Sequence, residues 1–213
     1  MGIMQFGNGV FMPDGKTVSP AINAQKLTGK KNELEVAIKG LEFKKGFTNM
    51  AQAFSMAEDM FIKGARKSAQ QAVMLIIDGK PSFKFMTNEM VEQLDDKGIM
   101  RYFIVVNNQG PNSDVMKQMK VWASQPWETN LIHIQGWAML EADFDLWVQR
   151  ALVKFCPMAY SPAMLSGKRR HTVMPTSRTL AGVATREMFS ARPWMALTSA
   201  LRLRLALTKS FRI

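Results

Sequence analysis

The sequence is poor in the side chains that build reactive sites. Its 213 residues contain one cysteine, Cys156, and two histidines, His133 and His171. One cysteine cannot form an internal disulfide, and no cysteines and histidines lie at a zinc-binding spacing. His133 lies inside an apolar run, where a histidine more often has a structural role than a catalytic one. These shortages argue against an enzyme, and we predict that the protein is not one.

Signals for targeting and for nucleotide binding are also missing. No run of about 18 apolar residues is present, which excludes a membrane-spanning helix. The start of the chain, MGIMQFGNGVFMPDG, has neither the basic residues nor the long apolar stretch of a signal peptide. No GxxxxGK[ST] phosphate-binding loop occurs anywhere. The sequence therefore gives no sign of membrane insertion, secretion or P-loop chemistry.

Acidic residues are almost absent from the last quarter of the chain. Residues 1–157 hold 18 Lys and Arg against 16 Asp and Glu, a net charge of +2. Residues 158–213 hold 10 basic residues against one acid, Glu187, a net charge of +9. The apolar residues of this second segment follow no single period. We predict one domain over residues 1–157 and an irregular, Arg-rich tail over residues 158–213 that is disordered or weakly helical.

Apolar runs and helical patterns alternate along the predicted domain. Continuous apolar runs that stop at turn residues predict strands, and apolar residues at three- and four-residue spacings predict helices. The predicted strands are residues 3–6, 72–77, 99–106 and 131–134, all parallel. The predicted helices are residues 32–46, 50–61, 86–97, 112–124 and 137–155, with a loop over 10–32. This order predicts an α/β fold, a doubly wound and mainly parallel sheet with helices on both faces.

Two oxygen-bearing side chains are predicted to meet at the carboxyl edge of this sheet. Thr48 precedes a predicted helix, and Asp78 directly follows the strand 72–77. Ligands of such sheets bind at that edge, and a hydroxyl with a carboxylate suits a hard cation such as Mg²⁺. The alternative is that Thr48 or Asn49 only caps the helix and that Asp78 only begins a turn. The residues by themselves leave both interpretations open.

Two motifs resemble the von Willebrand factor A (VWA) or integrin I-type domain: G-F-T-N-M-A-Q-A-F at residues 46–54 and V-M-L-I-I-D-G at residues 73–79. The resemblance covers roughly residues 1–156 and implies a Rossmann-like fold with a metal-ion-dependent adhesion site (MIDAS) at the carboxyl edge. In that family the metal ligands come from a D-x-S-x-S loop, a Thr that opens a helix and an Asp that ends a strand. Thr48 matches that Thr and Asp78 matches that Asp, so the resemblance implies both as metal ligands.

The D-x-S-x-S loop of the family occurs nowhere in the sequence. The chain begins where the second strand of the family would begin, so we expect the first strand to be missing and the sheet to contain a gap. Mg²⁺ binding should then be weak or absent. The chain is either a fragment of a longer VWA protein, which we favour, or a divergent member that has lost the metal. Cys156 fits a fragment, because many extracellular VWA domains pair such a cysteine with one before the first strand.

The resemblance implies a non-catalytic, adhesion-type module that binds a protein ligand at the carboxyl edge through an incomplete MIDAS. An extracellular or cell-surface location would follow if the full-length parent resembles secreted VWA proteins. The alternative is an electrostatic binder of nucleic acid or of an anionic membrane that acts through residues 158–213, where Lys168-Arg169-Arg170 form a basic cluster.

Overall fold

The computed structural model describes residues 1–16, 18–66 and 68–155. Cys156, His171 and the basic segment 158–213 lie outside the described residues. The predictions made for them therefore stay predictions.

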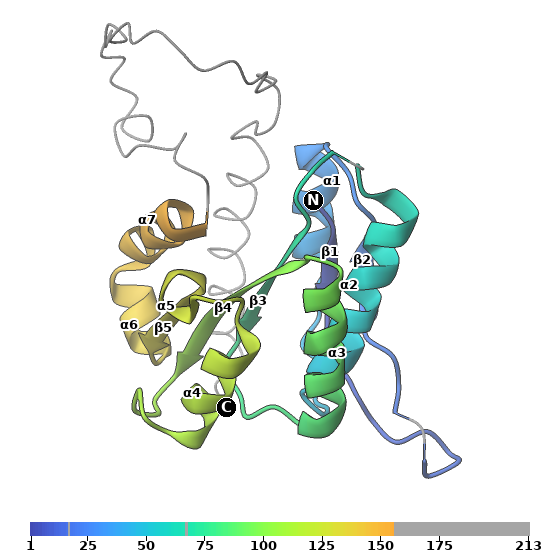
Figure 1. Cartoon of the computed structure of the whole chain (residues 1–213), viewed down its shortest axis with the longest axis horizontal. Coiled ribbons are helices and arrows are strands. Elements are labelled where there is room, and N and C mark those ends of the chain that lie inside the picture. Colours follow the sequence, from blue (N-terminus) through green and yellow to red (C-terminus); the bar gives the residue numbers. More distant parts are fainter. Residues whose placement is uncertain (17, 67, 156–213) are drawn as a thin grey trace, which may run out of the picture.

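A parallel three-stranded sheet forms the centre of the described structure (Figure 1). Its strands are β3 (Ala72–Ile77), β4 (Met100–Asn107) and β5 (Leu131–Gln135), with β4 in the middle. Pairing of β3 with β4 starts at Ala72 opposite Met100 and continues without interruption. Continuous apolar runs predicted all three strands, because a parallel sheet that is covered on both faces buries successive side chains.

Three helices cover one face of this sheet. They are α2 (Met50–Gly64), α3 (Lys84–Asp96) and α4 (Asp114–Trp122). Their buried side chains form one cluster with the strands, in which Phe54 of α2 meets Phe103 of β4 edge to face at 6.4 Å between ring centroids. The apolar stripes of α2 and α4 are thus the stripes that the sequence pattern predicted. On α3, Val91 and Leu94 are buried as the pattern predicted, whereas Met86, which it placed on the same inward side, is exposed.

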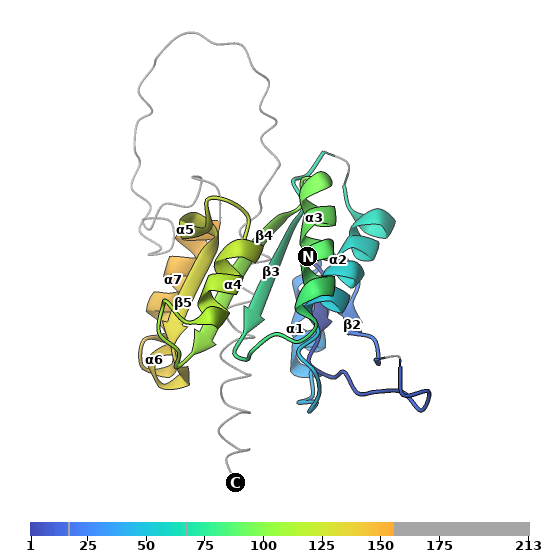
Figure 2. The same ribbon diagram turned by 60° about the horizontal axis from the view of Figure 1, so that its bottom comes forward.

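The opposite face carries α6 (Trp137–Ala142) and α7 (Phe144–Phe155) (Figure 2). A second, smaller cluster lies there, in which Ile104 and Ile134 of the strands are buried with Leu140 of α6. Helices therefore lie on both faces of a parallel sheet. The predicted α/β fold class is confirmed.

The prediction that the first strand runs parallel in the same sheet is wrong. β1 (Ile3–Gln5) pairs antiparallel with β2 (Ile22–Gln25), and the two form a separate sheet. β2 lies in the segment that the sequence predicted to be a loop. Its residues Ile-Asn-Ala-Gln contain no apolar run, and its extended conformation depends on pairing with β1, which a local pattern does not show.

The expected break in the sheet is confirmed, since no ladder joins β1 to β3 among the described residues. Side-chain packing connects the two sheets instead. Met4 and Phe6 pack, partly buried, against the cluster that contains Val73 and Leu75 of β3. α1 (Lys31–Lys39) contacts β1 and β2. A shared apolar core rather than hydrogen bonding therefore holds the small sheet to the large one.

Two helix boundaries differ from the predicted ones. α1 ends at Lys39 rather than at residue 46. Gly40 is its C-cap and donates its N–H to the carbonyl of Val36. The predicted helix 137–155 is two helices, α6 and α7, separated at Asp143, whose φ of −126° is not helical. The short helix α5 (Trp127–Asn130) was not predicted.

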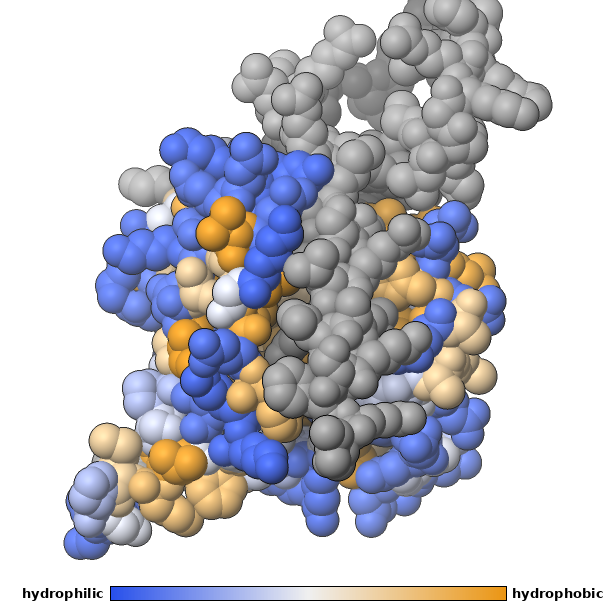
Figure 3. Space-filling model, turned by 180° about the vertical axis from the view of Figure 1, so that it is seen from behind, coloured by the Kyte–Doolittle hydropathy of each residue, from blue (hydrophilic) through white to orange (hydrophobic). Residues whose placement is uncertain are grey.

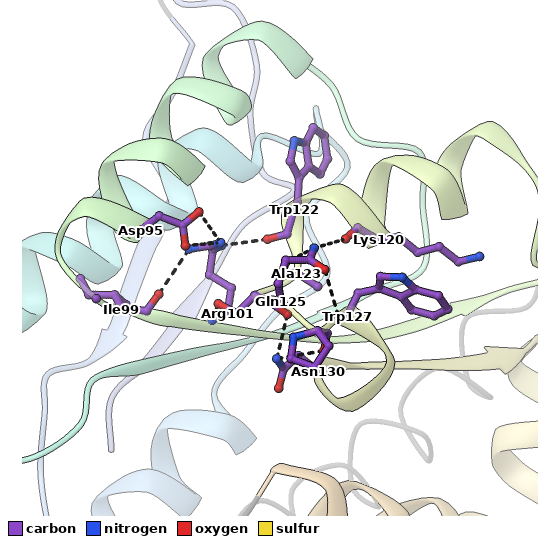
Figure 4. A network of polar contacts seen from close by, with 12 residues as sticks. Asp95, Ile99, Arg101, Lys120, Trp122, Ala123, Gln125, Trp127 and Asn130 are labelled. Carbon is purple, nitrogen blue, oxygen red and sulfur yellow. Dashed lines mark hydrogen bonds and ion pairs between the residues drawn. The ribbon is translucent and has the colours of Figure 1, made fainter.

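A buried arginine at the start of β4 ties the sheet to two helices (Figure 4). Arg101 has 2% of its side chain exposed. Its guanidinium donates to the Trp122 carbonyl at 2.8 Å and to the Ile99 carbonyl at 3.3 Å, and it pairs with the Asp95 carboxylate at 2.7 Å. Trp122 is the last residue of α4, so Arg101 supplies a partner to a carbonyl that the helix itself leaves without one.

None of the helices in the described ranges is both long and apolar enough to cross a membrane.

Candidate functional site

Four loops meet at the carboxyl edge of the parallel sheet. Asp78 and Gly79 follow β3, Asn108 follows β4, and Gly136 follows β5. The fourth loop brings Thr48 to the start of α2. This is the edge at which parallel α/β sheets bind their ligands, because the loops after successive strands gather there.

Thr48 and the Asp78-Gly79 turn are neighbours at this edge. The Thr48 hydroxyl oxygen lies 3.6 Å from the position that a Cβ on Gly79 would take. The Ser82 N–H donates to the Thr48 carbonyl at 3.0 Å, which ties the segment after β3 to the segment before α2. Thr48 is half-buried and Asp78 is exposed. The structure thus places Thr48 beside the turn that begins at Asp78, 30 residues further along the chain.

The N-cap of α2 is Asn49, not Thr48. The Asn49 side chain accepts a hydrogen bond from the Gln52 N–H at 3.2 Å. Among the described residues, neither the Thr48 hydroxyl nor the Asp78 carboxylate has a hydrogen-bond or ion-pair partner. The simpler interpretation of Thr48 as a helix cap is therefore wrong, and its hydroxyl is left for another role.

Close backbone contact positions the loop that carries Thr48. The Phe47 N–H donates to the Gly9 carbonyl at 2.7 Å, and these two residues form an isolated antiparallel bridge. Just before it, Gly46 packs on the backbone of Asn8 and Gly9. A glycine at position 46 is needed because the two backbones leave no room for a side chain.

We expect Gly46→Ala to move this loop and to lower the free energy of unfolding by about 1–3 kcal/mol. A Cβ at position 46 would lie 2.5 Å from backbone atoms of Asn8 and Gly9, which cannot rotate away as a side chain could. Chemical denaturation measures the loss. Gly29→Ala is the matched control, since a Cβ there meets nothing within 4 Å. Equal stability of the two variants would contradict the role of Gly46.

A polar pair lies at the ends of β4 and β5. The side-chain oxygen of Asn107 is 3.1 Å from Nε2 of His133 and accepts a hydrogen bond from the Gln109 N–H at 3.0 Å. Asn107 is buried, and its side-chain nitrogen has no partner among the described residues. His133 thus has a side-chain partner in the sheet, which agrees with the structural role predicted for it. Next to this pair, the Asn108 amide occupies the space that a Cβ on Gly136 would need.

The oxygen donors at this edge suit a hard cation, but they are few. Thr48 offers a hydroxyl and Asp78 a carboxylate. No group of three or more His, Cys, Asp or Glu that could hold a metal occurs within the described ranges. Mg²⁺ commonly keeps several water ligands and needs only one or two carboxylates. The residues therefore fit a cation that is held mostly by water.

A family model for the von Willebrand factor type A domain matches residues 1–144. The chain belongs to the VWA domain family. Among solved structures it is similar to the manganese-loaded TRAP protein of Plasmodium vivax, with 18% identity and a TM-score of 0.43. That similarity covers 56% of this chain and 52% of the TRAP chain, so the chain spans about half of that structure. No curated protein sequence matches the chain.

A row of aromatic residues that the sequence pattern did not predict lies beside Thr48. Phe11 meets Phe47 edge to face at 5.0 Å between ring centroids, and Phe47 meets Phe83 at 5.6 Å. Phe83 also has a left-handed backbone, with φ of 55°, which is uncommon for a residue other than glycine. The runs F-K-K-G-F at 43–47 and F-K-F at 83–85 were a visible signal, because they alternate aromatic and basic residues in loops.

Proposed function

We propose that the chain is a non-catalytic, adhesion-type module that binds a protein ligand at the carboxyl edge of its sheet. Membership of the VWA family supports this proposal, since Thr48 and Asp78 match two ligand positions of the family's MIDAS. The observation that carries it is the position of the Thr48 hydroxyl against the Asp78-Gly79 turn, where neither the hydroxyl nor the Asp78 carboxylate has a partner in the part of the chain that the structure describes. The one histidine of the described residues, His133, lies 3.1 Å from the Asn107 side-chain oxygen, and this pairing supports a structural role for it.

We further propose that Mg²⁺ binds here, and binds weakly. The Asp78 carboxylate and the Thr48 hydroxyl would hold the ion, and water would fill the other positions. Bound at this edge, the cation would supply a positive charge for an acidic group of the protein ligand. Without a D-x-S-x-S loop, two protein oxygens give a dissociation constant on the order of millimolar.

Titration calorimetry of the full chain with Mg²⁺ and with Mn²⁺ tests the site. Asp78→Asn and Thr48→Ala are expected to abolish the weak binding. The matched control is Asp96→Asn, which removes an exposed carboxylate at the other end of α3 and should leave binding unchanged. Micromolar affinity, or equal loss in Asp78→Asn and Asp96→Asn, would show that the metal is held elsewhere or by other residues.

A second candidate function rests on the charge of residues 158–213, which is +9. Such a segment would bind nucleic acid or an anionic membrane through counterion release and surface potential. Affinity of the full chain for a DNA duplex should then fall steeply with salt. Replacing Lys168, Arg169 and Arg170 together by glutamine should weaken it, and unchanged affinity would exclude this cluster as the binding element.

A further inference from the structure

A hairpin with exposed apolar residues on its first arm projects from the carboxyl edge. Phe11 and Val18 form an antiparallel bridge, and the Ser19 N–H donates to the Val10 carbonyl at 2.9 Å. Val10, Phe11 and Met12 are exposed on it. Figure 1 shows this segment extending from the lower edge of the molecule, and Figure 3 shows apolar residues on the same lobe, seen from behind at the lower left. These side chains contribute little to the core.

The hairpin is continuous with the start of α3. Through the row of Phe11, Phe47 and Phe83 it reaches the first turn of α3, where Phe85 is 73% exposed and Met86 is also exposed. We call this surface the aromatic edge. Each of its members is either exposed to solvent or in edge-to-face contact with another member, and all lie at one end of the fold: Val10, Phe11, Met12, Phe47, Phe83, Phe85 and Met86. Contiguous apolar surface of this kind marks an interaction site.

Lysines surround the aromatic edge. Five exposed lysines lie within a few residues of its members along the chain: Lys16, Lys44, Lys45, Lys80 and Lys84. Four acids lie equally near along the chain, and one of these, Glu42, is paired with Lys44 at 2.6 Å. Asp14, Asp78 and Glu89 are the other three. Positive charge therefore exceeds negative charge around the apolar side chains.

We propose that the aromatic edge docks on an anionic lipid membrane. Projecting phenylalanine and methionine side chains insert into the boundary between head groups and acyl chains, while lysine ammonium groups remain at the level of the anionic head groups. The first arm of the hairpin and the first turn of α3 carry side chains of this kind, and the lysines supply the charge complementarity. The docking needs no metal. It goes beyond the proposed function, and a protein ligand at the same edge would then be bound at the lipid surface.

Site-specific fluorescence on the full chain tests the docking. In a Cys156→Ser background, Phe85→Cys is labelled with an environment-sensitive dye. The matched control is Ile62→Cys, because Ile62 is 74% exposed and lies 12 residues beyond the start of α2, about 18 Å away from the edge. The probes are phosphatidylcholine vesicles with and without about one-third phosphatidylserine, in buffer with EDTA. We expect a blue shift and a several-fold rise in emission at position 85 with the anionic vesicles alone, and no change at position 62.

Sedimentation with the same vesicles supplies the second measurement and needs no label. Phe11→Ser with Phe85→Ser should reduce bound protein several-fold, and Lys80→Gln with Lys84→Gln should do the same. Binding of the chain without any dye response at position 85 would assign the binding to residues outside the edge and overturn the proposal. An equal response to neutral vesicles would overturn the requirement for anionic lipid. Asp78→Asn should dock normally, which separates this result from failure of the metal site.

Discussion

Replacing Arg101 with methionine is expected to lower the free energy of unfolding by about 2–5 kcal/mol. The cost comes from the carbonyls of Ile99 and Trp122, which are buried and would lose the guanidinium as their donor. Each buried polar group without a partner costs about 1–3 kcal/mol. The melting temperature should fall by about 5–15 °C in a chain of this size, as measured by circular dichroism.

The ion pair of Arg101 with Asp95 should matter much less than these carbonyls. Asp95 has 58% of its side chain exposed, which screens the charge interaction, and the amide oxygen of an asparagine at this position can still accept from the guanidinium. Asp95→Asn is therefore the matched control, with an expected loss of about 1 kcal/mol or less. If Asp95→Asn cost as much as Arg101→Met, the ion pair and not the two carbonyls would be the main contribution.

Phe103→Ala is expected to destabilise the protein by about 3–5 kcal/mol. Phe103 is fully buried in the middle of the central strand β4, where its ring packs edge to face against Phe54 of α2. Truncation removes the buried ring and leaves a cavity between sheet and helix that the closely packed core cannot fill. Because whole domains are stable by about 5–15 kcal/mol, such a loss could leave much of the chain unfolded. Urea denaturation measures it.

Phe43→Ala removes the same side chain from a position that is 72% exposed, and the stability should change by less than about 0.5 kcal/mol. Similar losses for both variants would mean that residue 103 is not in the core. The comparison thus tests the identity of the central strand, on which the position of every loop at the carboxyl edge depends.

The sequence indicated the positions of Thr48 and Asp78 in the fold better than it indicated their roles. Thr48 and Asp78 could be placed at one edge because parallel strands end on the same side of a sheet. Whether Thr48 or Asn49 capped α2 could not be decided, since both residue types are good caps and the choice depends on one backbone turn. The structure assigns the cap to Asn49 and leaves the Thr48 hydroxyl without a partner among the described residues.

The aromatic edge could not be predicted from local patterns in the sequence. Phe11, Phe47 and Phe83 are far apart in the sequence, and none belongs to an apolar period that would mark it as a core residue. They meet because the bridge between Gly9 and Phe47 and the hydrogen bond from Ser82 to Thr48 bring three loops together. Contacts of this range depend on the fold and cannot be read from spacing.

Apolar patterns along the chain were enough to predict the class of the fold and the strands β3, β4 and β5, because burial on both faces requires continuous apolar runs such as Ala72–Ile77. The VWA motifs were also visible in the sequence, because their residues are adjacent along the chain. The tertiary structure was needed to establish the antiparallel pairing of β1 with β2 and the burial of Arg101. The partners in the β1–β2 ladder are 17–22 residues apart along the chain, and Arg101 donates to the Trp122 carbonyl 21 residues away. Local patterns in the sequence indicate which face of a helix or strand is apolar. The hydrogen-bond partners of that helix or strand are determined only when distant segments of the chain pack together.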